Sequence, residues 1–155
     1  MLPFFHSSLP PADPTNALLS FAYSLLTADL MAAIQTVGLD PYIGFFHQIK
    51  YGKPCLALDL MEEFRSVIAD SVVITLINNR RIKPEDFTQS HGGWYLKERS
   101  RKVFYAAYET RKNETITHPV FKYKLTFRRA MELQVRLLAK YLTGEIDQYA
   151  PLTIR

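Results

Sequence analysis

The chain has 155 residues, of which 48% are hydrophobic and 13% aromatic, so it is long and apolar enough to fold around a core of its own. This composition excludes bulk disorder and fibrous architectures. The single cysteine, Cys55, excludes an internal disulfide and a cysteine-rich zinc site, and it is typical of a reducing, intracellular compartment. The first residues form neither a basic leader nor a signal-length apolar segment, so we predict a soluble, cytoplasmic protein with no membrane partner.

The formal net charge of +4 conceals a strong asymmetry along the chain. Residues 1–77 carry three basic and seven acidic side chains, whereas residues 78–155 carry sixteen basic and eight acidic ones. A basic half is the electrostatic pattern of a protein that binds a polyanion such as nucleic acid. Solvated lysines and arginines on long helices would give the same count, and charge alone leaves both interpretations open.

The predicted elements of the first half are helices. Residues 1–14 are rich in proline and predict a linker or the remnant of a preceding segment, while residues 15–155 predict one helical domain. A first helix runs to about Val37, with Thr15 or Asn16 as its cap and Gly38 as its stop. Polar residues interrupt it, so it suits a buried helix of a soluble protein better than a bilayer span. A second helix spans about residues 54–78.

The second half predicts more helix. Residues 84–87 suggest a short helical turn, and the pair Gly92 and Gly93 suggests a tight loop. Two further helices follow over about residues 96–112 and 121–143, and Gly144 ends the latter. We therefore predict an all-α fold.

The second predicted helix carries carboxylates close to its apolar side. At about 100° per residue, Asp59 and Glu62 lie about 60° apart on a face of their own, while Glu63 falls at the edge of the apolar arc. Arg65 is displaced from this acidic pair, and His47 lies on the preceding loop. Three interpretations remain open: a solvated helix face, a half-buried hydrogen-bonding cluster, or a Mg²⁺ or Mn²⁺ site completed by the imidazole.

Other residues indicate less. We predict that Cys55 is a small buried side chain at a helix start, and that His6, His91 and His118 are surface or loop residues. Phosphate-loop, serine-hydrolase and zinc-protease motifs are missing from the sequence. Basic residues after the second helix suit phosphate contacts, and the aromatic residues between them suit a core better than a stacking platform. These aromatic residues are Trp94, Tyr95, Phe104, Tyr105, Tyr108 and Tyr123.

Four stretches of the sequence carry a resemblance to a known family. In order and spacing, PPADPTNALLSFAYSLL, GLDPYIGFFH, KPCLALDLMEEFR and GGWYLKERSRKVFYAAYE resemble the C-terminal helical domain of the CRISPR-associated spacer-acquisition endonuclease and integrase, the catalytic "Cas one" subunit. The resemblance runs from about Pro10 to the C-terminus. It implies a metal-dependent DNA endonuclease and integrase that joins the 3′-hydroxyl of incoming DNA to the CRISPR repeat array by transesterification.

The resemblance also implies site residues and partners. His47 and Glu62 would hold Mg²⁺ or Mn²⁺, with Asp59 as a supporting catalytic carboxylate. The partners would be double-stranded DNA, a small second adaptation subunit and, in the intact family protein, a second copy. The residues expected to bind DNA are Arg65, Arg80, Arg81 and Lys83.

The sequence departs from the family in one respect. The family's first metal ligand is a glutamate in an upstream Gly-any-Glu-Gly segment, which follows an N-terminal β-rich domain, and this sequence contains neither part. The resemblance therefore implies a fragment that lacks one metal ligand. The alternative function is a non-catalytic helical module for DNA binding or assembly.

Overall fold

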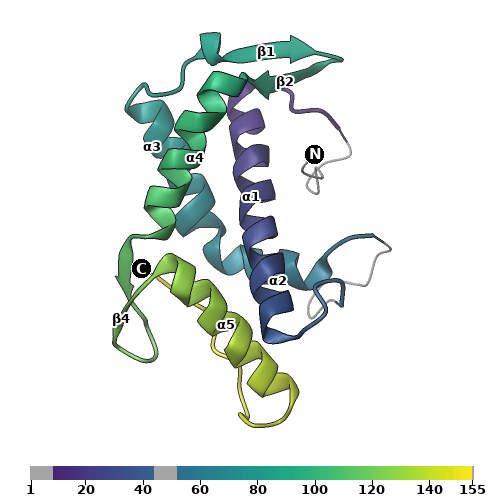
Figure 1. The fold of residues 1–155 in the computed structure, drawn as a ribbon, viewed down its shortest axis with the longest axis vertical. Helices are drawn as coiled ribbons and strands as arrows, with labels where there is room; N and C mark the ends of the chain where they lie inside the picture. Colours follow the sequence, from purple (N-terminus) through teal and green to yellow (C-terminus); the bar gives the residue numbers. More distant parts are fainter. Residues whose placement is uncertain (1–8, 44–51, 155) are drawn as a thin grey trace.

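The computed structural model describes residues 9–43 and 52–154, and the elements are arranged around one long helix (Figure 1). This helix, α1 (Pro14–Val37), packs against α2 (Cys55–Phe64) and α5 (Phe127–Leu142) toward one end of the molecule. Toward the other end it lies beside α3 (Ser71–Asn78), while α4 (Glu98–Lys112) packs on α3. Since the central helix is covered from several sides, the core runs along its whole length.

The ends of α1 follow from local chemistry. The side chain of Asp13 accepts a hydrogen bond from the Asn16 backbone N–H at 2.8 Å, and Pro14 occupies the first turn, where its missing N–H costs nothing. The cap is therefore Asp13 and not the predicted Thr15 or Asn16. Gly38 ends the helix with φ = 95°, a left-handed conformation that favours glycine, and this prediction is confirmed.

The inward face of α1 forms the centre of the core. Leu18, Leu26, Leu30 and Ile34 are at most 1% exposed. By length and mean hydropathy alone, α1 would also suffice to cross a membrane. In the fold, its buried leucines contact the helices around it.

The second predicted helix contains an irregularity that its sequence does not reveal. It is continuous from α2 to α3, but the six residues between them form a π-helix, η1 (Arg65–Asp70). A π-turn holds about one residue more than an α-turn, so it rotates everything after it by about 100° relative to a regular helix. Asp70 thus occupies the angular position that residue 69 would take in a regular helix. Residue 69 is seven residues after Glu62, which is nearly two full turns, so this position lies close to that of Glu62.

The all-α prediction is wrong in detail, because two short antiparallel ribbons accompany the helices. β1 (Phe87–Ser90) pairs with β2 (Gly93–Leu96), and β3 (Thr115–Thr117) pairs with β4 (Lys124–Thr126). Strands of three or four residues are too short for the alternation that identifies a strand in a sequence. Over residues 9–43 and 52–154 the fold is mostly helical, with two small hairpins.

The hairpins also explain two boundaries. The predicted tight loop lies at His91 and Gly92, which both have positive φ and connect β1 to β2. The short 3₁₀ turn η2 (Pro84–Asp86) directly precedes β1 and matches the predicted helical turn. The last helix starts six residues later than predicted, because the Thr126 hydroxyl caps it by accepting a hydrogen bond from the Arg129 N–H at 3.2 Å.

Candidate functional site

The three carboxylates of α2 have different surroundings. Asp59 is 8% exposed, whereas the Glu62 side chain is 49% exposed. A guanidinium nitrogen of Arg65 lies 3.5 Å from a Glu62 carboxylate oxygen, so the prediction that Arg65 is displaced from the acids is wrong. The spacing i, i+3 brings the two side chains together as they leave α2. Glu62 is therefore the α2 carboxylate most open to a ligand.

Glu63 anchors α2 to the C-terminal part of the chain. Its carboxylate accepts hydrogen bonds from the Gln134 side-chain amide at 2.8 Å, the Tyr149 hydroxyl and the Leu152 backbone N–H at 2.8 Å. Burial and the neighbouring carboxylate raise the pKa of Tyr149, so this hydroxyl stays protonated and donates. Glu63 is more than the boundary residue that its angular position predicts, because three donors fix its orientation.

The same network contains a buried histidine. His118 lies in the loop between β3 and β4, as predicted, but it is fully buried. His91 is exposed as predicted, and His6 lies outside the described residues. The His118 Nδ1 faces the N–H groups of Val120 and Phe121, both at 3.2 Å, and must accept from them. The ring proton is therefore on Nε2, which donates to the Gln134 side-chain oxygen at 3.2 Å.

A second polar cluster lies where α2 passes into the π-helix. The Tyr23 hydroxyl on α1 donates to Asp70 at 2.7 Å. Burial and this hydrogen bond raise the pKa of Tyr23 to about 12, the charge of Glu62 adds to the increase, and Arg65 opposes it. The charges of Asp70, Glu62 and Arg65 therefore all act on the Tyr23 hydroxyl. Sequence reasoning missed Asp70 and Tyr23, because a regular helix would turn Asp70 away.

The fit of this site to a divalent cation is partial. His47, the predicted imidazole ligand, lies outside the described residues. Within residues 9–43 and 52–154, no three His, Cys, Asp or Glu side chains are close enough together to hold a metal ion. Carboxylates such as Asp59 and Glu62 are the donors that Mg²⁺ and Mn²⁺ prefer. Carboxylate chemistry therefore suits a hard cation, but the described residues do not bring three such ligands together.

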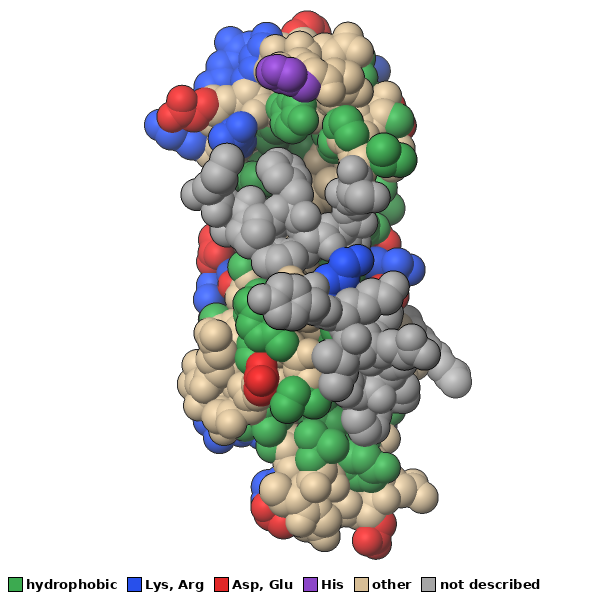
Figure 2. Space-filling model, turned by 90° about the vertical axis from the view of Figure 1, so that its right-hand side faces the viewer, with side chains coloured by type: hydrophobic (Ala, Val, Ile, Leu, Met, Phe, Trp, Pro, Cys, Tyr) green, Lys and Arg blue, Asp and Glu red, His purple; other side chains and the backbone are tan. Residues whose placement is uncertain are grey.

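The predicted DNA-binding residues other than Arg65 lie in the loop after α3. Arg80, Arg81 and Lys83 are all exposed. On the face seen in Figure 2, lysine and arginine side chains lie near the end of the molecule that carries β1 and β2 and also around its middle. In the described part of the chain, no ion pair neutralises these three cations.

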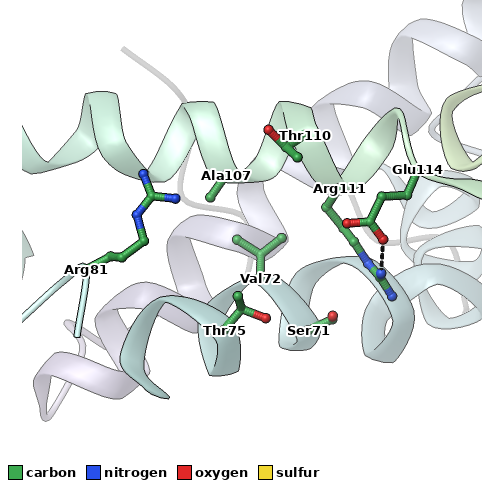
Figure 3. Close-up of a pocket in the computed structure, with 8 residues that line it drawn as sticks. All are labelled: Ser71, Val72, Thr75, Arg81, Ala107, Thr110, Arg111 and Glu114. Atoms are coloured by element: carbon green, nitrogen blue, oxygen red, sulfur yellow. Dashed lines mark hydrogen bonds and ion pairs between the residues drawn. The ribbon is translucent and has the colours of Figure 1, made fainter. Parts of the chain in front are cut away.

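Arg81 also lines a pocket of about 140 Å³ between α3 and α4. Figure 3 shows its side chain reaching toward α4 at one end of this pocket, with the ion pair of Arg111 and Glu114 at the other. The Arg111 Nε donates to the Val67 carbonyl at 2.7 Å, which links α4 to the π-helix. The pocket is lined by Ser71, Val72, Thr75, Arg81, Ala107, Thr110, Arg111 and Glu114.

The aromatic residues of the basic half divide into two groups. Phe104 and Tyr108 are buried in the core, as predicted. Tyr105 and Tyr123 are 39% and 49% exposed, so the core prediction is wrong for these two rings. Burial raises the pKa of Tyr108, and its hydroxyl donates to Asp29 at 2.8 Å.

Comparisons with known proteins point to one family. The family model described as CRISPR associated protein Cas1 matches residues 7–110. A Cas4/Cas1 fusion described as CRISPR-associated exonuclease and endonuclease, from Geobacter sulfurreducens, is 52% identical over 94% of this chain and 26% of its own length. A CRISPR-associated endonuclease Cas1 from Thermus thermophilus is 49% identical over 96% of this chain and 45% of its own length. The chain thus spans less than half the length of these relatives.

Solved structures give the same answer for the fold. A casposase bound to its integration product superposes with a TM-score of 0.84 at 30% identity, over 95% of this chain and 42% of the other. A Cas1 protein from Thermotoga maritima gives a TM-score of 0.81 at 28% identity, over 89% of this chain and 42% of the other. A Cas6-RT-Cas1–Cas2 complex gives a TM-score of 0.78 at 25% identity, over 98% of this chain and 17% of the other chain.

Proposed function

Because this chain belongs to the CRISPR-associated Cas1 family, we propose that it is the helical catalytic part of a metal-dependent DNA endonuclease and integrase of CRISPR adaptation. One observation carries the proposal: α2 is anchored through Glu63 and directs the neighbouring Glu62 to the surface, with Asp59 one turn away. A carboxylate on a rigid support is what a hard cation requires.

Glu62 and His47 would hold Mg²⁺ or Mn²⁺, with Asp59 in support. Such an ion would polarise the phosphodiester and favour ionisation of the attacking hydroxyl. In the proposed reaction the 3′-oxygen of incoming DNA bonds to a phosphorus of the repeat as the bond to the repeat's own 3′-oxygen breaks. One phosphodiester replaces another, so no external energy source is needed. Arg65, 3.5 Å from Glu62, would neutralise phosphate charge beside the acids.

The partners follow from the same relationship. Double-stranded DNA is supported by the exposed cations of the 80–83 loop and by a neighbour whose description includes an integration product. A small second adaptation subunit is supported by the neighbour described as a Cas1–Cas2 complex. A second copy of the chain remains part of the proposal through family membership.

Binding of Mn²⁺ by the chain tests the site directly. We expect free Mn²⁺ at about ten times its Kd to raise the melting temperature by about 3 °C, because a ligand that binds only the folded state stabilises it. Glu62→Ala and His47→Ala should each abolish this shift. Asp147→Ala removes an exposed carboxylate elsewhere and should preserve it. Equal melting temperatures with and without Mn²⁺ in the unsubstituted chain would contradict an intact site.

A second candidate function is a non-catalytic helical DNA-binding or assembly module. It is favoured by the exposed basic loop, which does not require the acids of α2. This module would bind duplex DNA equally well with and without a chelator. Metal-dependent nicking or strand transfer by the chain, lost in Glu62→Ala, would exclude it.

A further inference from the structure

The hairpin of β3 and β4 ends in large apolar side chains that face solvent. Val120, Phe121 and Tyr123 are 50%, 43% and 49% exposed. The rings of Phe121 and Tyr123 are stacked, with centroids 6.0 Å apart and planes 25° from parallel. Adjacent exposed rings at the tip of a hairpin are a costly arrangement for a free surface and indicate a site of interaction.

Two lysines alternate with these rings along the chain. Lys122 follows Phe121, and Lys124 follows Tyr123; both are exposed. Nearby Arg128 and Arg129 pair with Glu109 and Glu132, whereas no ion pair holds either lysine in the described part of the chain. Their ammonium groups are therefore available to an anionic ligand.

The hairpin tip (residues 118–124) is held rigidly from beneath. The buried His118 accepts hydrogen bonds from the N–H groups of Val120 and Phe121, and its ring lies 4.8 Å from that of Phe121. The backbone N–H of His118 donates to the Tyr123 carbonyl at 2.9 Å, and the backbone N–H of Lys122 donates to the His118 carbonyl at 2.9 Å. The rings are thus positioned before any ligand arrives, which reduces the entropy lost on binding.

The anchor of the tip also contacts the acidic helix. Gln134 accepts from His118 and donates to Glu63, so a single side chain connects the hairpin to α2. A shallow hollow beside the tip is lined by Thr117, Pro119, Lys122, Thr153 and Ile154. Hydroxyl and ammonium donors in this hollow suit a phosphate group.

We propose that the hairpin tip is a stacking platform for unpaired bases of a DNA strand. Bases stack on Phe121 and Tyr123, while phosphates of the same strand contact Lys122 and Lys124. The alternation of ring and cation matches the alternation of base and phosphate, and base stacking on aromatic rings tolerates any sequence. A protein partner fits less well, because lysine is depleted from the cores of protein interfaces.

This inference deepens the proposed function by naming single-stranded DNA as one form of its substrate, and it does not require the metal. Binding should therefore be measured in a chelator, by anisotropy of a labelled ten-nucleotide single strand and of a blunt duplex of equal length. We expect Phe121→Ala and Tyr123→Ala each to weaken single-strand binding about fivefold or more. Duplex binding should change by less than about twofold, because paired bases cannot reach the rings.

Two controls separate stacking from folding and from charge. Tyr123→Phe keeps the ring and should retain the affinity, and Tyr105→Ala removes a ring that is 39% exposed on α4 and should have little effect. A 2-aminopurine in the single strand should be quenched by the unsubstituted chain and not by Tyr123→Ala. The proposal is overturned if Tyr123→Ala binds the single strand normally, or if Tyr123→Phe loses as much single-strand affinity as Tyr123→Ala. It is also overturned if Tyr123→Ala lowers the affinity for the duplex as much as the affinity for the single strand.

The two proposals can fail separately. Single-strand binding that depends on Tyr123 in a chain without a Mn²⁺ response would support the platform and count against the metal site. A Mn²⁺ response that depends on Glu62, in a chain whose Phe121 and Tyr123 variants bind normally, would do the reverse. A changed oligomeric state in the Tyr123 variant, with unchanged DNA affinity, would indicate a protein contact and overturn the platform.

Discussion

At the scale of single residues, Glu62 and Glu63 are adjacent but serve opposite purposes. Glu62 is half exposed and contacts only Arg65 among the ion pairs of the described residues. Glu63 accepts three hydrogen bonds from groups 71 to 89 residues away in the sequence. One carboxylate is thus available for function, and the other holds the helix in place.

This difference predicts opposite effects of the same substitution. Glu63→Ala should lower the free energy of unfolding by about 3 kcal/mol, because it leaves the Tyr149 hydroxyl and the Leu152 N–H without their acceptor. Glu62→Ala should change it by less than about 1 kcal/mol, since exposed ion pairs contribute little. Urea unfolding monitored by circular dichroism measures both. A larger loss in Glu62→Ala than in Glu63→Ala would contradict these roles.

At the scale of elements, helix periodicity predicts most of the fold. The lengths of α1, α2 with α3, and α4 follow from apolar spacing and from stops such as Gly38, and Cys55 is buried at a helix start as predicted. The ribbons could not be predicted, because their strands are too short to alternate. The last predicted helix begins at residue 121, but the hairpin and the Thr126 cap place its start at Phe127.

The candidate site was also predictable only in part, because helix periodicity locates residues on one helix and says nothing of contacts between elements. Asp59 and Glu62 share a helix, so their proximity follows from the helical period. Partners from other elements, such as Tyr149 to Glu63 and Tyr23 to Asp70, depend on tertiary packing. Asp70 also depends on the π-turn, which has no signature in the local sequence.

The π-helix predicts an unusual tolerance of deletion. Removing the exposed Ser66 should convert η1 into regular α-helix while α3 keeps its orientation, so the free energy of unfolding should change by less than about 1 kcal/mol. Removing the exposed Thr75 from α3 should cost more than about 3 kcal/mol, because it rotates the buried Leu76 out of the core. Urea unfolding of both deletions checks this. Equal destabilisation would show that η1 does not contain the extra residue.

At the scale of the whole molecule, charges are segregated both in sequence and in space. Four of the seven acids of the first half lie on α2 and the π-helix, while exposed cations without an ion pair in the described residues include those of the 80–83 loop and of the hairpin tip. Several arginines of α5 instead form local ion pairs; Arg129 and Arg136, for example, both pair with Glu132. Counting charges in the sequence therefore overstates the cations that can meet DNA.

That distinction predicts which cations set the salt dependence of duplex binding. Replacing Arg80, Arg81 and Lys83 by alanine should reduce the slope of log K against log salt by about 2.7, because each phosphate contact contributes about 0.9. Replacing Arg129 and Arg136 removes two cations already paired with Glu132, so the slope should change little. Filter binding of a blunt duplex from about 50 to 200 mM salt, in a chelator, measures both. If the α5 pair lowers the slope as much per residue as the loop does, DNA lies along α5, and the 80–83 loop loses its special role.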